Sequence, residues 1–308
     1  MRIFNALHKF NLREFNHNVR QFFLYGIAIN AGMALFTLLY NLYLLRLSYQ
    51  EDFIGQVAGM APLATGLLAL PIGMLSDRWG RKLFLLVSSL LLAASQLGLC
   101  LATDATALLF FSFVGGMATA CIWVNHVPFL SDNAQPSRRA EALVLWSAIQ
   151  VAVRMLWSLV GGFLPGIMSY LLNTSTQMPE PFRYALLLGA FCSLVSALPL
   201  LRMPRRVGAQ EQAAAKSAAS SMPTGSPWHI FAAITALSGT RGFAMGLTYP
   251  FFNVFFEEQL HIGATAIGAI FFLSQLVGLP ATFSAPALVR RFGATLTILS
   301  ARSIGGLA

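Results

Sequence analysis

Apolar runs of about 20 residues recur along this chain, and they constrain its fold more than any other feature. A run of that length is long enough to cross a bilayer as one helix. In hydrocarbon every backbone N–H and C=O group must bond internally, so a spanning segment is a helix or a strand of a closed barrel. Barrel strands would give segments of about ten residues with alternating polarity, and the sequence lacks them. We therefore predict an all-α polytopic membrane protein.

The amino-acid composition agrees with this class. Hydrophobic residues make up 56% of the chain and charged residues 10%, whereas soluble domains average about 45–50% and 25%. A net charge of +9 would suggest a nucleic-acid partner in a soluble protein, but here the basic residues gather in alternate segments between the apolar runs. Under the positive-inside rule this asymmetry places the N-terminus and the even-numbered loops in the cytoplasm. We expect a protein of the plasma membrane (the inner membrane of a bacterium) that binds no nucleic acid.

The apolar runs divide the chain into two unequal parts. Residues 1–20 form a basic cytoplasmic tail, 21–201 a bundle of six helices, 202–227 a polar cytoplasmic linker of low complexity, and 228–308 a second, incomplete bundle. The predicted helices are 21–46, 53–74, 83–102, 107–131, 140–168, 182–201, 228–256 and 264–288. A ninth run begins at 294 and is too short to cross a bilayer comfortably. We expect the sequence to be truncated in this ninth helix; a natural protein of eight and a half helices is the alternative.

A densely charged turn, residues 73–82, separates the second and third predicted helices. Charges at this density cannot lie in hydrocarbon, so the turn must lie at a membrane surface. A weaker copy occurs at residues 286–295, and the same spacing that relates Gly80 to Gly293 also relates Gly55 to Gly268. The repeat predicts two related halves.

The first turn resembles the signature turn of the major facilitator superfamily, Gly-x-Leu-x-Asp-Arg-x-Gly-Arg-Lys. Seven of its positions match: Gly73, Leu75, Asp77, Arg78, Gly80, Arg81 and Lys82. The second turn keeps Leu288, Arg291 and Gly293 but has Arg290 in place of the acid. Asp132 and Arg139, with six residues between them, resemble an acidic-x6-Arg element of the same family.

The resemblance implies a fold of two six-helix bundles, of which the N-terminal bundle is complete here and the C-terminal one incomplete. It also implies a secondary-active transporter of a small solute that works by alternating access. In this family the charged turn is thought to latch the two halves together at the cytoplasmic side. The expected latch residues are Gly73, Asp77, Arg78, Gly80, Arg81, Lys82, Asp132 and Arg139. The alternative is that the cations only orient the helices during insertion.

Two departures from the family's motifs bear on the kind of transport. Gly161-Gly162 is preceded by Trp157-Ser158 where drug–proton antiporters carry Gly-Pro, and Gly115-Gly116 lacks the preceding Arg of many proton-coupled members. A drug–proton efflux pump therefore becomes an alternative rather than the first expectation. A non-transporting receptor or scaffold of the same fold is the other alternative.

Polar side chains inside the apolar runs are the candidates for a substrate cavity, because burying them in lipid is costly. The expected cavity residues are Asn30, Thr37, Asn41, His126, Gln150, Arg154, Arg241 and Thr248. Both arginines lie near mid-membrane depth and would suit an anionic or strongly polar solute. The alternatives are hydrogen bonds between helices, arginine bonds to backbone carbonyls, and, for His126, a packing role instead of a proton-carrying one.

We find no enzyme constellation, no metal-ligand spacing, and no Gly-rich phosphate loop followed by Lys-Ser/Thr. We therefore expect neither catalysis nor a cofactor nor a metal. The three cysteines fall in apolar runs and predict no disulfide. The expected partners are a small solute and the bilayer, with a proton as the candidate coupling ion, and the protein is expected to be a monomer. Since no Asp or Glu lies within the cores of the predicted helices, uniport, anion exchange and histidine-based coupling stay open beside carboxylate-based symport.

Overall fold

The computed structural model describes residues 15–204, 251–293 and 296–297, and every regular element in those ranges is a helix. Within these ranges, six helical segments are long and apolar enough to cross a membrane. They are α2 (His17–Arg46), α3 (Glu51–Trp79), α4 (Arg81–Leu101), α5 (Ala105–Asn133), α6 (Arg139–Leu172) with the short η2 (Pro136–Arg138) before it, and α7 (Pro179–Val195) with its continuation α8 (Ala197–Leu201). The predicted all-α membrane class is confirmed.

Two further helices follow from the second part of the chain, α11 (Phe252–Glu258) and α12 (Ala264–Phe292). The tail before residue 15, the linker, most of the predicted helix 228–256 with Arg241 and Thr248, and most of the ninth run lie outside the described residues. The incomplete second bundle is consistent with what is described.

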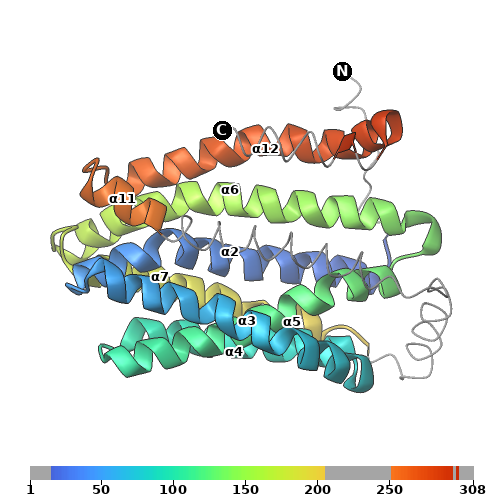
Figure 1. The fold of residues 1–308 in the computed structure, drawn as a ribbon, viewed down its shortest axis with the longest axis horizontal. Helices are drawn as coiled ribbons and strands as arrows, with labels where there is room; N and C mark the ends of the chain where they lie inside the picture. Colours follow the sequence, from blue (N-terminus) through green and yellow to red (C-terminus); the bar gives the residue numbers. More distant parts are fainter. Residues whose placement is uncertain (1–14, 205–250, 294–295, 298–308) are drawn as a thin grey trace.

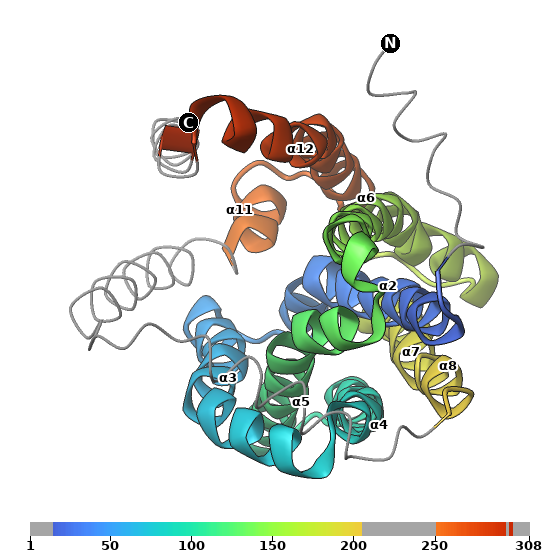
Figure 2. The same cartoon turned by 90° about the vertical axis from the view of Figure 1, so that its right-hand side faces the viewer.

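The helices run roughly along the long axis of the molecule, which is horizontal in Figure 1, between the two ends of the bundle. The turn end holds Gly80, the α5–α6 connection and the C-terminus of α12. The far end holds the α2–α3, α4–α5 and α6–α7 connections together with the link between α11 and α12. Viewed end-on, α2 lies in the middle, with α3, α4 and α5 on one side and α6 and α12 on the other (Figure 2).

The central position of α2 follows from its sequence. A helix that is apolar on all sides has to be buried, and most of α2 is, including Phe22, Tyr25, Leu35 and Tyr43. One core cluster surrounds its far-end half and another its turn-end half. The Tyr43 hydroxyl donates to the Cys100 carbonyl of α4 at 3.1 Å, which satisfies the one polar atom of that buried ring.

Helix ends differ from the predicted bounds most at the charged turn. The sequence predicts a loop between residues 74 and 83, but α3 continues to Trp79 and α4 begins at Arg81, so the connection is Gly80 alone. Apolar length sets where a helix leaves the hydrocarbon. It does not set where the helix ends, because a helix continues freely into water.

Small residues set the closest helix contacts, as expected where helices pack within a membrane. A Cβ added at Gly268 of α12 would lie 2.5 Å from the Ser158 carbonyl oxygen of α6 and 2.9 Å from the Gly162 Cα. The Thr265 hydroxyl donates to the Gly162 carbonyl at 3.0 Å beside this crossing. The backbones of α6 and α12 are therefore in contact, and this contact joins the first six helices to the second part of the chain.

Candidate functional site

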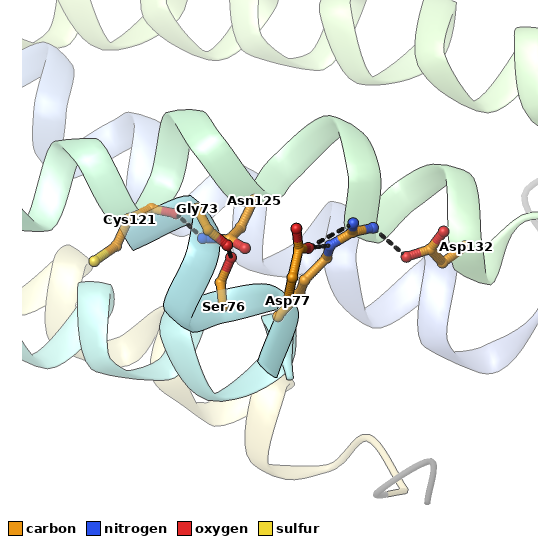
Figure 3. A network of polar contacts seen from close by, with 7 residues as sticks. Gly73, Ser76, Asp77, Cys121, Asn125 and Asp132 are labelled. Carbon is orange, nitrogen blue, oxygen red and sulfur yellow. Dashed lines mark hydrogen bonds and ion pairs between the residues drawn. The ribbon is translucent and has the colours of Figure 1, made fainter. Parts of the chain in front are cut away.

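The charged turn is built around Gly80, whose φ of 96° lies in the region that only glycine adopts cheaply. This conformation reverses the chain within one residue and brings the last turn of α3 beside the first turn of α4. Arg81 then donates from Nη2 to Asp77 Oδ1 at 2.9 Å and from Nε to the same oxygen at 3.3 Å. It also donates from Nη1 to Asp132 Oδ2 of α5 (Figure 3).

These three residues form what we call the Arg81 network, and it lies at the turn end. Arg81 is 21% exposed, Asp132 28% and Asp77 58%. The network joins α3, α4 and α5, all of which belong to the first six helices. Lys82 adds a bond from Nζ to the Met203 carbonyl at 2.6 Å, which ties the start of α4 to the end of α8.

The remaining predicted latch residues take different positions. Arg78 and Arg139 are exposed at the turn end. A Cβ added at Gly73 would meet Val124 Cγ1 at 3.5 Å, an ordinary contact, so this conformation does not itself require a glycine there.

A cavity of about 330 Å³ lies between α2, α3, α4 and α5, with Asn253 of α11 and Phe271 of α12 completing its lining. Of the predicted cavity residues, Thr37 and Asn41 line it. Its other polar lining residues are Tyr40, Ser95, Gln96, Ser112, Thr119 and Asn253. The sequence reasoning missed these. Gln96 was detectable, because an amide in the middle of an apolar run is itself a signal.

The other described cavity candidates, Asn30, His126, Gln150 and Arg154, do not line this space. The side chains of three of them bond within their own helix. Asn30 Nδ2 donates to the Gly26 carbonyl at 2.8 Å, and Arg154 Nε donates to the Gln150 carbonyl at 3.2 Å. The buried His126 has its Nδ1 3.0 Å from the Ile122 carbonyl oxygen. Its ring packs on Trp146, with 5.8 Å between the ring centroids.

At the far end an ion pair joins the two parts of the chain. Arg46, the last residue of α2, bonds from Nη2 to Glu257 Oε1 of α11. The two side chains are only 17% and 15% exposed, and the guanidinium carbon of Arg46 lies 5.6 Å from the ring centroid of Phe182. The predicted first helix ends at Arg46, but the sequence indicates no partner for it, because nothing local connects it with a residue so far along the chain.

Two hydrogen bonds from a side-chain amide also join α11 to α2, one helical turn before Glu257. Asn253 Nδ2 donates to the Thr37 and Leu38 carbonyls of α2, at 2.9 Å each. Outside the ion pair, an open hollow of about 690 Å³ is lined by charged and polar residues that include Arg46, Glu51, Glu257, Glu258 and His261. Direct contacts between α2 and α11 therefore join the two parts of the chain at the far end, and Asn253, which makes two of them, also lines the cavity.

The structure resembles solved transporters. It superposes on a bacterial homologue of the human lysosomal transporter Spinster, in an inward-facing and unoccupied conformation, with a TM-score of 0.66 and 16% identity, covering 89% of this chain and 62% of that one. It also matches the nucleoside transporter NupG, with a TM-score of 0.66 and 15% identity over 91% of this chain and 69% of that one. At these identities the likeness shows the fold alone.

Sequence comparisons agree with the fold. The putative metabolite transport protein YfiG of Bacillus subtilis (strain 168) is 26% identical over 150 residues, which are 49% of this chain and 30% of that protein. The matched part is thus less than a third of the length of that protein, and the chain covers 62% of the Spinster homologue and 69% of NupG. The family model of the Major Facilitator Superfamily matches residues 22–308. This chain, an integral membrane protein with the transporter fold, belongs to the Major Facilitator Superfamily.

Proposed function

We propose that this protein is a secondary-active transporter that carries a small solute through the α2–α5 cavity by alternating access. The observation that carries the proposal is the junction of α2 and α11 at the far end, which lies over a cavity with polar groups in its wall. In alternating access the two bundles rock about a midplane site. A solute could then reach the cavity from the far end only after Arg46 and Glu257 separate.

The charge distribution supports an orientation for this cycle. The turn end carries most of the basic residues, so the positive-inside rule places it in the cytoplasm. The far end then faces outward, and we assign the described conformation, in which α2 and α11 are joined there, to the state that is closed to the outside. The solved Spinster homologue is described as inward-facing, and its likeness to this chain supports the same assignment.

The Arg81 network has a separate role in this proposal. Its described bonds stay within the first six helices, where they hold α3, α4 and α5 together as one unit. We propose that it keeps the turn ends of α3, α4 and α5 fixed relative to one another, so that contacts with the second bundle form on a rigid surface. The scaffold alternative has no use for a polar cavity beneath an interhelical ion pair, and the drug–proton alternative lacks a described carboxylate in the cavity lining.

The alternating-access cycle can be tested without knowing the solute, by measuring how readily a reagent labels a cysteine in the cavity wall. In the full length that its gene encodes, and with Cys100, Cys121 and Cys192 replaced by Ser, Thr37→Cys serves as a probe in the cavity wall. We expect a membrane-impermeant maleimide to label it from either face of sealed vesicles. A reducible bifunctional methanethiosulfonate that joins Arg46→Cys to Glu257→Cys should abolish labelling from the far end, and reduction should restore it.

Two outcomes would contradict alternating access. One is labelling of Thr37→Cys from a single face both with and without the cross-link. The other is far-end labelling that the cross-link leaves unchanged. The matched control is the same reagent on a variant with only one of the two cysteines, which should leave labelling as it was.

A further inference from the structure

The far-end junction contains a pair of carboxyl groups, one from each part of the chain. Glu51 is the first residue of α3, and Glu258 is the last residue of α11. Both line the open hollow outside the Arg46–Glu257 ion pair, and their side chains are in hydrogen-bond contact. Two ionised carboxylates only accept hydrogen bonds and repel each other, so this contact requires a proton between them. The pair is therefore a contact that depends on protonation.

The packing of α3 against the residues around α11 brings the two carboxyl groups together. Gly55 lies one helical turn after Glu51, and a Cβ added there would lie 2.9 Å from Cζ of Phe251, the residue that precedes α11. Ile54 of α3 and Val254 of α11 belong to the same buried cluster. The carboxyl pair thus lies where the backbone of α3 meets the second part of the chain, and separating the two parts there would separate the pair.

The positions of the two acids in their helices indicate which of them holds the proton. A helix N-terminus stabilises a negative charge, and a helix C-terminus destabilises one. Glu51 lies in the first turn of α3 together with Asp52, whereas Glu258 ends α11 directly after Glu257. The hydrogen bond with Glu51, partial burial, and the charges of Glu51 and Glu257 all raise the pKa of Glu258. The shared proton is therefore held on Glu258.

The other titratable and charged groups in the described lining of the hollow are Arg46, Tyr49, Glu257 and His261. The Arg46 guanidinium bonds to Glu257, so it stabilises the ionised form of that neighbour. His261 follows α11, and histidine is the side chain that ordinarily titrates near neutral pH. Any test of the carboxyl pair must therefore separate its response from that of His261.

Resting on the outward orientation of the far end proposed above, we propose that the Glu51–Glu258 pair makes the outer gate sensitive to pH. Acidity on the outer side holds the far end closed, because the protonated contact exists only while α3 and α11 are together. Opening releases the proton, so the open fraction rises with the outer pH. Both residues are exposed at the same end of the bundle. The proton returns to the side from which it came, and outer pH regulates transport without driving it.

Labelling of Thr37→Cys from the far end tests the pH response. The full-length, otherwise cysteine-free protein is placed in sealed vesicles, and the outer pH is varied. Because a thiol itself reacts faster as it ionises, each rate is divided by that of Thr174→Cys, an exposed position in the α6–α7 connection. We expect the ratio to rise about 3- to 10-fold between about pH 5 and about pH 8, since it is limited by the change in the acid dissociation constant on opening. A ratio that does not change with pH overturns the proposal.

Amide variants assign the response to the pair. Glu258→Gln keeps a hydrogen bond to Glu51 without needing a proton, and Glu51→Gln does the same from the other side. Each should give a low labelling ratio that no longer depends on pH. His261→Gln is the matched control and should retain the full pH dependence. A response that survives in both amide variants, or one that disappears in His261→Gln, contradicts the assignment.

Thermal unfolding of the purified protein tests the protonated contact independently of transport. A group whose pKa is raised by folding stabilises the protein at low pH, and this stabilisation is lost as the pH rises through that pKa. The thermal midpoint of Glu258→Gln, compared with that of the unaltered protein, should therefore increase as the pH is raised. A difference that stays constant with pH contradicts the contact.

The gate and the transport cycle can fail separately. If Thr37→Cys is labelled from both faces and its pH profile is the same in Glu258→Gln, the pH-sensitive gate is wrong and alternating access stands. If the thermal difference grows with pH while Thr37→Cys is labelled from one face only, the protonated contact stands in a protein that does not alternate.

Discussion

At the residue scale, the Arg81 network combines one cation with two acids of unequal exposure. Asp77 is more than half exposed, whereas Asp132 is less than a third exposed. Water screens exposed pairs, which contribute about 0–1 kcal/mol. Removing one partner of a less exposed pair costs more, because the other charge is left without compensation. Asp132 should therefore be the stronger partner of Arg81, even though Asp77 belongs to the more recognisable motif.

This ranking predicts the order of three substitutions. Arg81→Gln removes the cation that both acids share and should lower the thermal midpoint of the purified protein most. Asp132→Asn should come second, and Asp77→Asn should cost no more than about 1 kcal/mol. Thermal unfolding in detergent measures the order, with the exposed far-end acid Asp52→Asn as the control. An Asp77→Asn variant that is the least stable of the set would refute the ranking.

Sequence reasoning reached part of this chemistry. Asp77 and Arg81 lie four residues apart, and Asp132 stands out as an acid after a long apolar run, so a pairing among them could be anticipated. Gln96, Asn253 and the Arg46–Glu257 pair could not, because which polar group faces a shared cavity depends on how distant helices pack. No local period encodes that arrangement.

At the element scale, the crossing of α6 and α12 depends on glycines that allow backbone contact. A Cβ added at Gly162 would lie 2.9 Å from the Ala264 carbonyl oxygen, and backbone atoms cannot yield as a flexible side chain can. One turn later on α6, a Cβ at Gly166 would meet no atom within 4 Å. The two glycines thus differ only in what faces them.

The contrast gives a matched pair of variants. Gly268→Ala or Gly162→Ala should destabilise the purified protein by about 1–3 kcal/mol, the usual cost of overpacking. Gly166→Ala should be neutral or slightly stabilising, since alanine favours helix. Thermal midpoints in detergent compare them. Equal midpoints for Gly162→Ala and Gly166→Ala would show that α6 and α12 do not touch there.

The sequence predicted which helices exist better than it predicted where they end. Apolar length identified each of the six spanning helices, and even Pro62 and Pro71 inside α3 did not mislead the prediction. The ends were set by features with a weaker sequence signal. A single glycine separates α3 from α4 in place of the expected loop, because charged residues extend both helices into the surface region.

At the scale of the whole molecule, the two ends of the bundle are organised differently. The Arg81 network ties helices of one half to each other, whereas the Arg46–Glu257 pair ties the two parts of the chain across the far end. Attraction between the two buried charges is offset by the cost of removing both from water. The pair can therefore contribute to an equilibrium between closed and open far ends without fixing either state.

Charge reversal tests this assignment. Arg46→Glu or Glu257→Arg places like charges against each other and should raise far-end labelling of Thr37→Cys several-fold, on the order of the shift produced by 1 kcal/mol or more. The double reversal should return labelling toward the original rate. Arg183→Gln is the control, since Arg183 is also a far-end cation and its Nε donates to the Cys100 carbonyl of α4. If the double variant does not restore the original labelling, the Arg46–Glu257 pair does not control access from the far end.

The two charged turns, around Gly80 and Gly293, share a backbone conformation but differ in charge. Gly80 and Gly293 both adopt positive φ, at 96° and 79°, while Arg290 stands in the second turn at the position that Asp77 has in the first. Replacing either glycine would strain the backbone, because a residue with a Cβ rarely adopts positive φ. Replacing a charged residue of the turn affects stability only where that residue has an ionic partner. Two related turns can therefore differ widely in charge and keep the same backbone corner.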